Sequence, residues 1–346
     1  MTTSAAFSGA ISNPTGYQNP IRKLILGLVL LAMTFCASLA FGQTSVPGDT
    51  LFAALFHFDA TNTQHLIVTG SRFPRAITAT LVGAALAVAG ALMQALTRNP
   101  LASPAILGVN AGAVFAIVCV STLLVTSSMT LLLWVGLAGA AAAAVLVYSL
   151  GSAGGGGPTP VRLVLAGAAI TALFVSFTQA LLVTNQEGLD SVLFWLAGSV
   201  SGRPLDMVLP TLPLILPALM ISVLLGRQIN LLMSGDDIAK GLGQNVVRLK
   251  ALLGLLVVCL AGSAVALAGS VGFVGLIVPH MVRGWFGRDH RWVIPGSALV
   301  GAILLLAADT LARFIIMPQE IPVGVMTALI GTPFFIVLCR RGLSRG

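Results

Sequence analysis

Residues 98–113 form a short polar break between two long apolar runs, and they read Arg98-Asn-Pro-Leu-Ala-Ser-Pro-Ala-Ile-Leu-Gly-Val-Asn-Ala-Gly-Ala113. Pro100 and Pro104 each stop a helix from running through the break. Asn99 and Ser103 stand directly before these prolines, and this turn chemistry is typical of a tight connection between helices. The break therefore predicts two helices joined by a turn, and the flanking runs indicate what kind of helices they are.

The composition describes a protein that lives in a membrane. Of the 346 residues, 57% are hydrophobic and only 8% are charged, whereas a soluble domain carries about a quarter charged residues. A helix needs about 20 apolar residues to cross a bilayer, and only a helix satisfies its own backbone polar groups there. We therefore predict an all-α polytopic membrane protein with ten transmembrane helices. The predicted spans are 24–41, 75–96, 106–126, 129–150, 161–184, 208–226, 249–268, 272–286, 293–313 and 323–339. The eighth is short, so 268–286 leaves other boundaries open.

Lysine and arginine set the orientation, because they accumulate on the cytoplasmic side of membrane proteins. With the N-terminus inside, 14 of the 18 Lys and Arg residues fall in the cytoplasm. The outer four are Arg72, Arg75, Arg203 and Arg313. Both termini are therefore predicted to be cytoplasmic. The net charge of +8 is a signal of topology and gives no reason to expect a nucleic acid partner.

The segmentation predicts one transmembrane domain, 24–341, between a mobile cytoplasmic N-terminus, 1–23, and a short tail, 342–346. The basic residues before the first run also resemble the start of a secretory signal, but ten spans balance the charges only if this run is retained.

In the second span Gly83, Ala87 and Ala91 recur at four-residue steps. This spacing predicts a smooth face where another helix packs closely.

The longest predicted cytoplasmic segment between spans is 227–248. Within it, Ser234 and Asp237 have the spacing of a capping box, with Ser234 as the N-cap. A short helix over 238–242 would then end near Gly243. Such a helix on the inner face is a surface that a soluble partner can grip, and a solvated loop that only folds locally is the open alternative.

The chain lacks the patterns of an enzyme. The glycine-rich stretch 151–160 has no Lys-Ser or Lys-Thr after its glycines, so no phosphate-binding loop is predicted and the chain does not hydrolyse nucleotide itself. The four histidines and four cysteines have no metal-ligand spacing, and no nucleophile–base pair suggests a membrane enzyme. No predicted span carries a charged residue near its middle, which weakens the alternative of an ion-coupled secondary transporter.

Six motifs occur together and in order, and they resemble the FecCD-type permease family. This family comprises the transmembrane subunits of ATP-driven importers for ferric siderophores, haem and vitamin B12. The resemblance covers about residues 60–341. The motifs are Arg72-Phe-Pro-Arg75, Arg98-Asn-Pro-Leu-Ala-Ser-Pro104, Trp195-Leu-Ala-Gly-Ser199, the loop 236–243, Val271-Gly-Phe-Val-Gly-Leu-Ile-Val-Pro-His280 and Glu320-Ile-Pro-Val-Gly324.

The resemblance implies a type II importer architecture in a bacterial inner membrane. Two permease subunits, either two copies of this chain or this chain and a sister permease, would enclose a central pathway. Two ATPase subunits would hold ATP and Mg below them, and a periplasmic or lipid-anchored substrate-binding protein would dock above. No cofactor and no metal is expected on this chain. The implied cargo is a ferric siderophore or a similar iron chelate, with vitamin B12 or haem as the alternative.

The resemblance also implies roles for individual residues. Arg72, Arg75 and Arg313 match arginines that receive acidic side chains of the binding protein; snorkelling to headgroups is the alternative for the first two, and a pair with Asp309 is the alternative for Arg313. Asn99 and Leu101 match the cytoplasmic gate. The ATPase-coupling residues would be Asp236, Asp237, Ile238, Ala239, Lys240, Gly241, Leu242 and Gly243. Polar residues available to the pathway are Thr171, Thr178 and Gln179, for which helix–helix hydrogen bonding is an equally good account.

Overall fold

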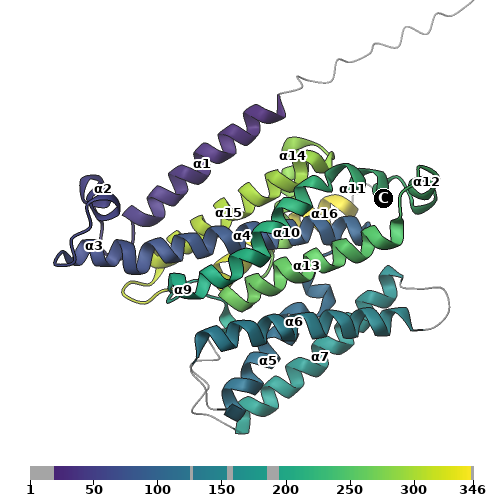
Figure 1. Cartoon of the computed structure of the whole chain (residues 1–346), viewed down its shortest axis with the longest axis horizontal. Helices are drawn as coiled ribbons and strands as arrows, with labels where there is room; N and C mark the ends of the chain where they lie inside the picture. The colour runs from purple at the N-terminus through teal and green to yellow at the C-terminus, as the bar shows by residue number, and fades with distance from the viewer. Residues whose placement is uncertain (1–18, 125–127, 154–158, 185–194, 344–346) are drawn as a thin grey trace, which may run out of the picture.

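The computed structural model describes residues 19–124, 128–153, 159–184 and 195–343, and in these residues helices follow one another through short loops (Figure 1). Each of the ten predicted spans overlaps one helix or helical segment. These are α1 (Pro20–Ala40), α4 (Phe73–Thr97), α5 (Val109–Leu124), α6 (Met129–Ser152), α7 (Pro160–Thr184), α9–η3–α10 (Leu205–Val208, Leu209–Thr211 and Leu212–Leu224), α13 (Val246–Ala268), α14 (Val274–Phe286), α15 (His290–Ile315) and α16 (Val323–Leu343). In the described part of the chain, seven helical segments are long and apolar enough to cross a membrane.

The first and last helices extend beyond the predicted bounds of the transmembrane domain. Residues 1–18, most of the expected mobile N-terminus, lie outside the described residues. Residues 20–23 of that segment are helical, because α1 begins at Pro20, where the Asn19 side chain caps it by accepting a hydrogen bond from the Ile21 amide. At the other end α16 continues to Leu343 into the expected tail, and residues 344–346 lie outside the described residues.

Short helices that hydropathy did not predict lie at both ends of the long ones. One end carries α2 (Gly48–Phe56) and α3 (Thr63–Ile67), which runs through the π-helical turn η1 (Val68–Arg72) into α4. The opposite end carries α11 (Gly226–Met233) and α12 (Asp236–Gly241), and the last turns of α16 point toward this same end, far from α2 and α3 (Figure 1). This arrangement agrees with a cytoplasmic face formed by 227–248 and the C-terminus.

Helix α4 is the centre of the molecule and packs against α13, α14 and α15. Of the apolar stretch that includes α4, 83% is buried, compared with 17% for α1 and for α7. Small side chains allow this position, since Gly83 lies against Gly301 of α15 and Gly90 lies against Gly275 of α14. A β-carbon added at Gly301 would meet Ala87 at 2.4 Å, so the predicted smooth face is confirmed as a helix-packing surface.

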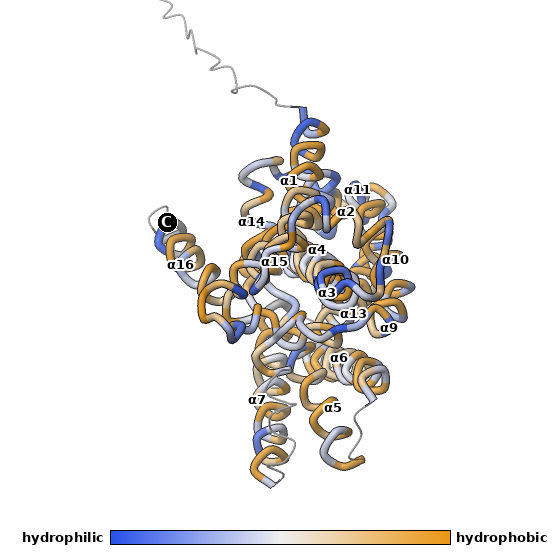
Figure 2. The backbone as a smooth tube through the Cα atoms, turned by 90° about the vertical axis from the view of Figure 1, so that its left-hand side faces the viewer, coloured by the Kyte–Doolittle hydropathy of each residue, from blue (hydrophilic) through white to orange (hydrophobic). Residues whose placement is uncertain are grey.

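Two groups of helices lie outside this core. Helices α5, α6 and α7 pack on one another, and α6 and α5 join them to α13 (Figure 1). Helix α16 stands apart at the edge, where it contacts α14 and α15 (Figure 2). Large apolar side chains of α1, α7 and α16 are exposed, as expected for faces that meet lipid or another subunit.

The glycine contact between α4 and α14 generates a stability prediction. Replacing Gly90→Ala would place a β-carbon 1.8 Å from the Gly275 carbonyl oxygen, and we expect a loss of about 1–3 kcal/mol or more because backbone atoms cannot move aside cheaply. The measurement is the thermal unfolding midpoint of the purified protein in detergent. Gly254→Ala in α13 is the matched control, since nothing lies within 4 Å of its β-carbon position. Equal midpoints for the two variants would contradict the packing described.

Candidate functional site

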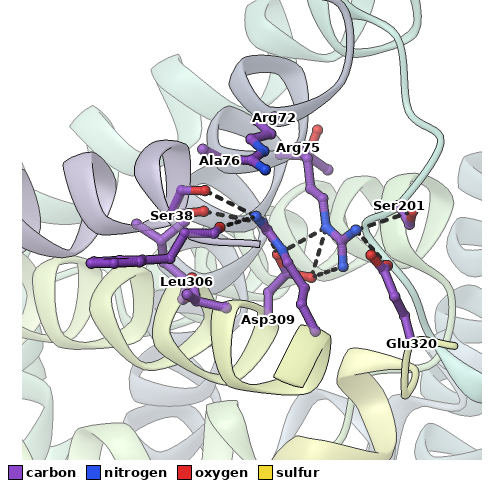
Figure 3. A network of polar contacts seen from close by, with 12 residues as sticks. Ser38, Arg72, Arg75, Ala76, Ser201, Leu306, Asp309 and Glu320 are labelled. Atoms are coloured by element: carbon purple, nitrogen blue, oxygen red, sulfur yellow. Dashed lines mark hydrogen bonds and ion pairs between the residues drawn. The ribbon is translucent and has the colours of Figure 1, made fainter. Parts of the chain in front are cut away.

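At the end that carries α2 and α3, arginine side chains bind together elements far apart in the sequence (Figure 3). The Arg72 guanidinium donates to the backbone carbonyls of Leu39 at 2.8 Å and Ala40 at 3.0 Å. It also donates to the carbonyl of Thr44. Arg72 therefore satisfies carbonyls at the open C-terminal end of α1 and fixes the chain that leads to α2.

Asp309 of α15 is the acceptor at the centre of this cluster. Arg75 donates to both of its carboxylate oxygens, from Nη2 at 2.8 Å and from Nε at 2.9 Å. Arg313, one helical turn further on, donates to the same carboxylate at 2.6 Å. Figure 3 shows Arg75 between Asp309 and Glu320, whose carboxylate accepts from Arg75 Nη1 at 2.6 Å. The Asp309 side chain is 1% exposed, whereas that of Glu320 is 28% exposed.

These contacts change how the three expected docking arginines are understood. Arg72, Arg75 and Arg313 are buried, with 6%, 7% and 2% of their surface exposed. The alternative pair of Arg313 with Asp309 is confirmed, and the Arg72 and Arg75 side chains bond inward where snorkelling would have turned them to headgroups. Docking stays a prediction. A carboxylate of a partner would have to displace Glu320 or Asp309 from Arg75 and backbone carbonyls from Arg72, since these guanidinium groups already hold acceptors.

Three of the sequence motifs meet in a backbone junction between α13, α14 and α16. The segment 195–199, which is helical at 195–197 and non-helical from Gly198 on, contacts the other two motifs. The amide of Ser270 donates to the carbonyl of Trp195 at 2.9 Å, and the amide of Gly324 donates to the carbonyl of Gly198 at 3.0 Å. Close approach of these backbones excludes a side chain at Gly324, where a β-carbon would lie 2.3 Å from the Ala197 oxygen.

The length of α14 indicates that the junction lies within the membrane. Helix α14 has 13 residues and spans only about 20 Å at 1.5 Å per residue, whereas the hydrocarbon core is about 30 Å thick. Non-helical backbone at such depth is tolerated only where protein buries it or where it lines a cavity. Phe273, which precedes α14 with a φ of 66°, packs against α16, since a β-carbon on Gly331 would lie 2.5 Å from the Phe273 β-carbon.

A cavity of about 150 Å³ lies beside this junction, between α14, α15 and α16. Its walls are almost entirely apolar and include Phe273, Ile277, Leu304 and Phe334. Pockets that enclose ligands usually measure roughly 300–1,000 Å³ and carry a few convergent polar groups. This cavity therefore does not suit a large polar cargo. Among the described residues, no three His, Cys, Asp or Glu side chains group together as metal ligands would.

The three expected pathway residues lie on α7 without converging. Thr178 is buried and its hydroxyl donates to the Phe174 carbonyl of the same helix at 2.7 Å. The Thr178 hydroxyl therefore donates within its own helix, and it makes no hydrogen bond to another helix as a donor. Thr171 is half-buried and Gln179 is exposed. Their role in a pathway stays a prediction.

The two expected gate residues lie in the loop that ends α4, at the same end of the molecule as α12. Arg98 ends the helix in the left-handed conformation with a φ of 50°. The Asn99 side chain then accepts a hydrogen bond from the Leu101 amide at 2.9 Å. Asn99 and Leu101 are both exposed, so they can meet a second subunit. Residues 98–101 are called the gate loop below.

The expected coupling segment contains a short helix, but its cap differs from the predicted one. Helix α12 begins at Asp236 with Gly235 as its N-cap and no side-chain cap. Ser234 still belongs to the end of α11, and Gly235, with a φ of 125°, separates the two helices, so the predicted capping box is wrong. The helix ends at Gly241, and Gly243 follows with a φ of 82°. Of the expected coupling residues, Ala239 is buried, Asp236 is partly buried, and the exposed ones are Asp237, Ile238, Lys240, Gly241, Leu242 and Gly243.

An ionic contact that sequence patterns did not predict joins the gate loop to α12. Arg98 donates to the Asp236 carboxylate, and Lys250 of α13 donates to the other oxygen of that carboxylate at 2.6 Å. The Lys250 hydrogen bond is the main reason that the pKa of Asp236 lies below its usual value, and Arg98 contributes further. The sequence offered only opposite charges 138 residues apart, which does not identify a pair.

A second polar contact holds α11 on α15. The Asn230 amide donates to the Asp289 carboxylate at 2.6 Å, and the amide of His290 donates to the Asn230 carbonyl oxygen at 2.9 Å. A hydrogen bond from Arg291 is the largest cause that lowers the pKa of Asp289 to about 2. This side of the segment before α12 is therefore anchored to a long helix.

The buried arginine cluster predicts a graded loss of stability. Asp309→Asn removes the charge that two buried guanidinium groups share, and we expect a loss of about 3–5 kcal/mol because a broken buried pair leaves charge uncompensated. Glu320→Gln should cost less, since its side chain is partly exposed. Thermal unfolding in detergent gives the ranking, with exposed Asp49→Asn in α2 as the control. Equal stability of the Asp309 and Asp49 variants would show that the cluster does not hold the helices together.

Comparisons with known proteins agree with this geometry. The family model of the FecCD transport family matches residues 30–341. The probable siderophore transport system permease protein YfiZ of Bacillus subtilis (strain 168) is 52% identical over 319 residues, covering 92% of this chain and 96% of that protein. The Fe(3+)-citrate import system permease protein YfmD of the same organism is 43% identical over 322 residues, covering 93% and 95%.

A solved structure of a metal-chelate type ABC transporter in an inward-facing conformation superposes with a TM-score of 0.81 at 31% sequence identity. The superposition covers 93% of this chain and 99% of that one. Sequence and fold therefore agree over nearly the whole length. The chain is a multi-pass membrane protein that belongs to the FecCD transport family.

Proposed function

We propose that this chain is the permease subunit of an ATP-driven importer that moves a ferric siderophore, or a similar iron chelate, across the bacterial inner membrane. The observation that carries the proposal is the full-length agreement with permeases of siderophore and ferric citrate transport systems. Cargo is assigned as a class, since the two relatives are named for different iron chelates.

The structure supports a transport subunit whose energy comes from another protein. Helix α12 presents a mixed surface at one end of the long helices. Ile238 and Leu242 are 57% and 67% exposed there, one helical turn apart. Exposed apolar anchors flanked by charged Asp237 and Lys240 are typical of a surface that a soluble protein covers. The partner proposed is an ATPase that binds ATP and Mg, present in two copies.

The exposed apolar faces support a second permease subunit. Leu165 of α7 is 66% exposed and Leu329 of α16 is 59% exposed, and the cavity beside α16 does not suit a large polar cargo. A pathway between two subunits would provide the space that this cavity lacks, because each subunit would supply only one wall of the pathway. The partner is either a second copy of this chain or a sister permease, and α2 and α3 at the opposite end from α12 offer the surface for a periplasmic or lipid-anchored binding protein.

The other transport hypotheses differ in what they require. Import of haem or vitamin B12 would use the same mechanism and the same contacts, so cargo has to be measured. A secondary transporter would need ionisable groups within the bilayer. The buried carboxylate of Asp309 lies near one end of α15 and already holds two arginines, which favours a structural role for it.

Uptake in a strain that lacks this gene tests the proposed cargo. Labelled ferric chelates, ferric citrate, haem and cobalamin should be compared with a strain complemented by the wild-type chain. We expect one class of iron chelate to be lost and the other uptakes to stay unchanged. Loss of cobalamin or haem uptake alone would overturn the assignment of cargo, and normal uptake of every compound, with no ATPase co-purifying with the chain, would overturn the function.

Binding of the ATPase tests the role of α12. Ile238→Asp combined with Leu242→Asp should reduce co-purification of the ATPase by roughly tenfold or more, because removing anchor residues from an interface costs about 2 kcal/mol or more. Both side chains are exposed, so folding should not change. Phe56→Asp on α2 is the matched control, since Phe56 is 69% exposed at the opposite end. Equal recovery of the ATPase with all variants would show that α12 does not contact the ATPase.

A further inference from the structure

The gate loop is attached to the segment around α12 by the side chain of Arg98. Its guanidinium leaves the end of α4 and donates to the carbonyl of Leu232, near the end of α11, at 2.8 Å. The same nitrogen donates to the carboxylate of Asp236, the first residue of α12. One side chain that borders Asn99 and Leu101 therefore contacts the helix expected to meet the ATPase.

Asp236 is the matching residue on α12. One carboxylate oxygen accepts from Arg98 and the other accepts from Lys250 of α13, so the two cations share a single negative charge. The pKa of Asp236 is lowered, first by the hydrogen bond from Lys250. A carboxylate with a depressed pKa keeps its charge at neutral pH and loses the contact only when the pH falls through that pKa.

The exposure of this contact distinguishes it from the arginine cluster at the other end. The side chains of Arg98, Asp236 and Lys250 are 39%, 34% and 36% exposed. An exposed ion pair is individually weak, so it can form and break as the protein moves. The buried Asp309 carboxylate, at 1% exposure, is suited to a fixed joint instead.

Helix α12 is bounded on both sides by glycines with positive φ angles, which separate it from α11 and α13. Gly235 and Gly243, with φ angles of 125° and 82°, lie on either side of the helix. Between them, Ala239 packs inward and Ile238 points to the surface that we assign to the ATPase. Asp236 thus connects the partner-facing helix to the gate loop.

We propose that Arg98 and Asp236 are positioning residues that carry a displacement of α12 to the gate loop, with Lys250 holding Asp236 to α13. This inference rests on the proposed function, because it requires an ATPase that moves α12. Removing either partner leaves both helices folded and the ATPase bound, but the gate loop follows α12 less closely.

The test measures movement of the gate loop directly. A chain with its four native cysteines replaced by serine and with Leu101→Cys is reconstituted with its ATPase in liposomes. The rate at which a charged maleimide labels position 101 is measured without nucleotide and with ATP and vanadate. Arg98→Gln and Asp236→Asn are compared with Arg22→Gln, which removes a cytoplasmic charge exposed at the start of α1.

With Arg98 and Asp236 intact, ATP and vanadate should change the labelling rate. We expect Arg98→Gln and Asp236→Asn to reduce that change by roughly two- to fivefold, the factor that the coupling energy of an exposed ion pair allows. Arg98→Lys should recover part of it because the charge remains. The Arg22 control should respond like the unmodified gate.

Two results would overturn the inference. An equal nucleotide response in all variants would show that the gate loop moves without this contact. Loss of the bound ATPase in the Arg98 and Asp236 variants would show that these charges hold the ATPase and do not position the gate. Failure of the proposed function gives a different pattern, because the complex with intact Arg98 and Asp236 would then show no nucleotide response and no uptake of a ferric chelate.

Discussion

The contact of α4 with α14 and α15 through paired glycines is the constraint on which the other features depend. Gly83 faces Gly301 and Gly90 faces Gly275 with no room for a β-carbon. Helices in a membrane gain little from hydrophobic burial against one another, so close packing of small residues has to supply much of their association. A central helix with small residues at these positions brings α14 and α15 close to it, and polar contacts form at both of its ends.

The two ends of α4 carry arginines that differ in their burial. Arg75 lies near the start of the helix and Arg98 closes it, about 35 Å away at 1.5 Å per residue. Arg75 is buried against Asp309, and breaking that pair would leave charge without compensation. Arg98 is partly exposed and shares Asp236 with Lys250, so its contact is weak and reversible. Helix α4 is therefore held by a buried pair at one end and by a partly exposed one at the other, which is the asymmetry that the proposed transmission of movement requires.

Hydropathy predicted the long helices well, and it failed for groups whose role depends on a distant partner. Each apolar run from α1 to α16 was recognised because lipid leaves the backbone no structure other than a helix. The capping box at Ser234 was wrong because Ser234 still ends α11 and Gly235 turns the chain before α12 starts. Arg72 and Arg75 were placed at the correct end of the molecule, but burial by α1 and α15 could not be inferred from their neighbours in the chain.

The sequence alone determined the membrane class, the order and orientation of the helices, and the family, because hydropathy, basic residues and short motifs act locally along the chain. The motif around Arg98 also located the gate loop, since its prolines end a helix wherever they occur. Only the tertiary structure decided which charges distant in the sequence are paired. Asp309 and Arg75 are 234 residues apart, and Asp236 and Arg98 are 138 apart. An ion pair depends on distance in space and on exposure to water, and packing of the small-residue faces sets both.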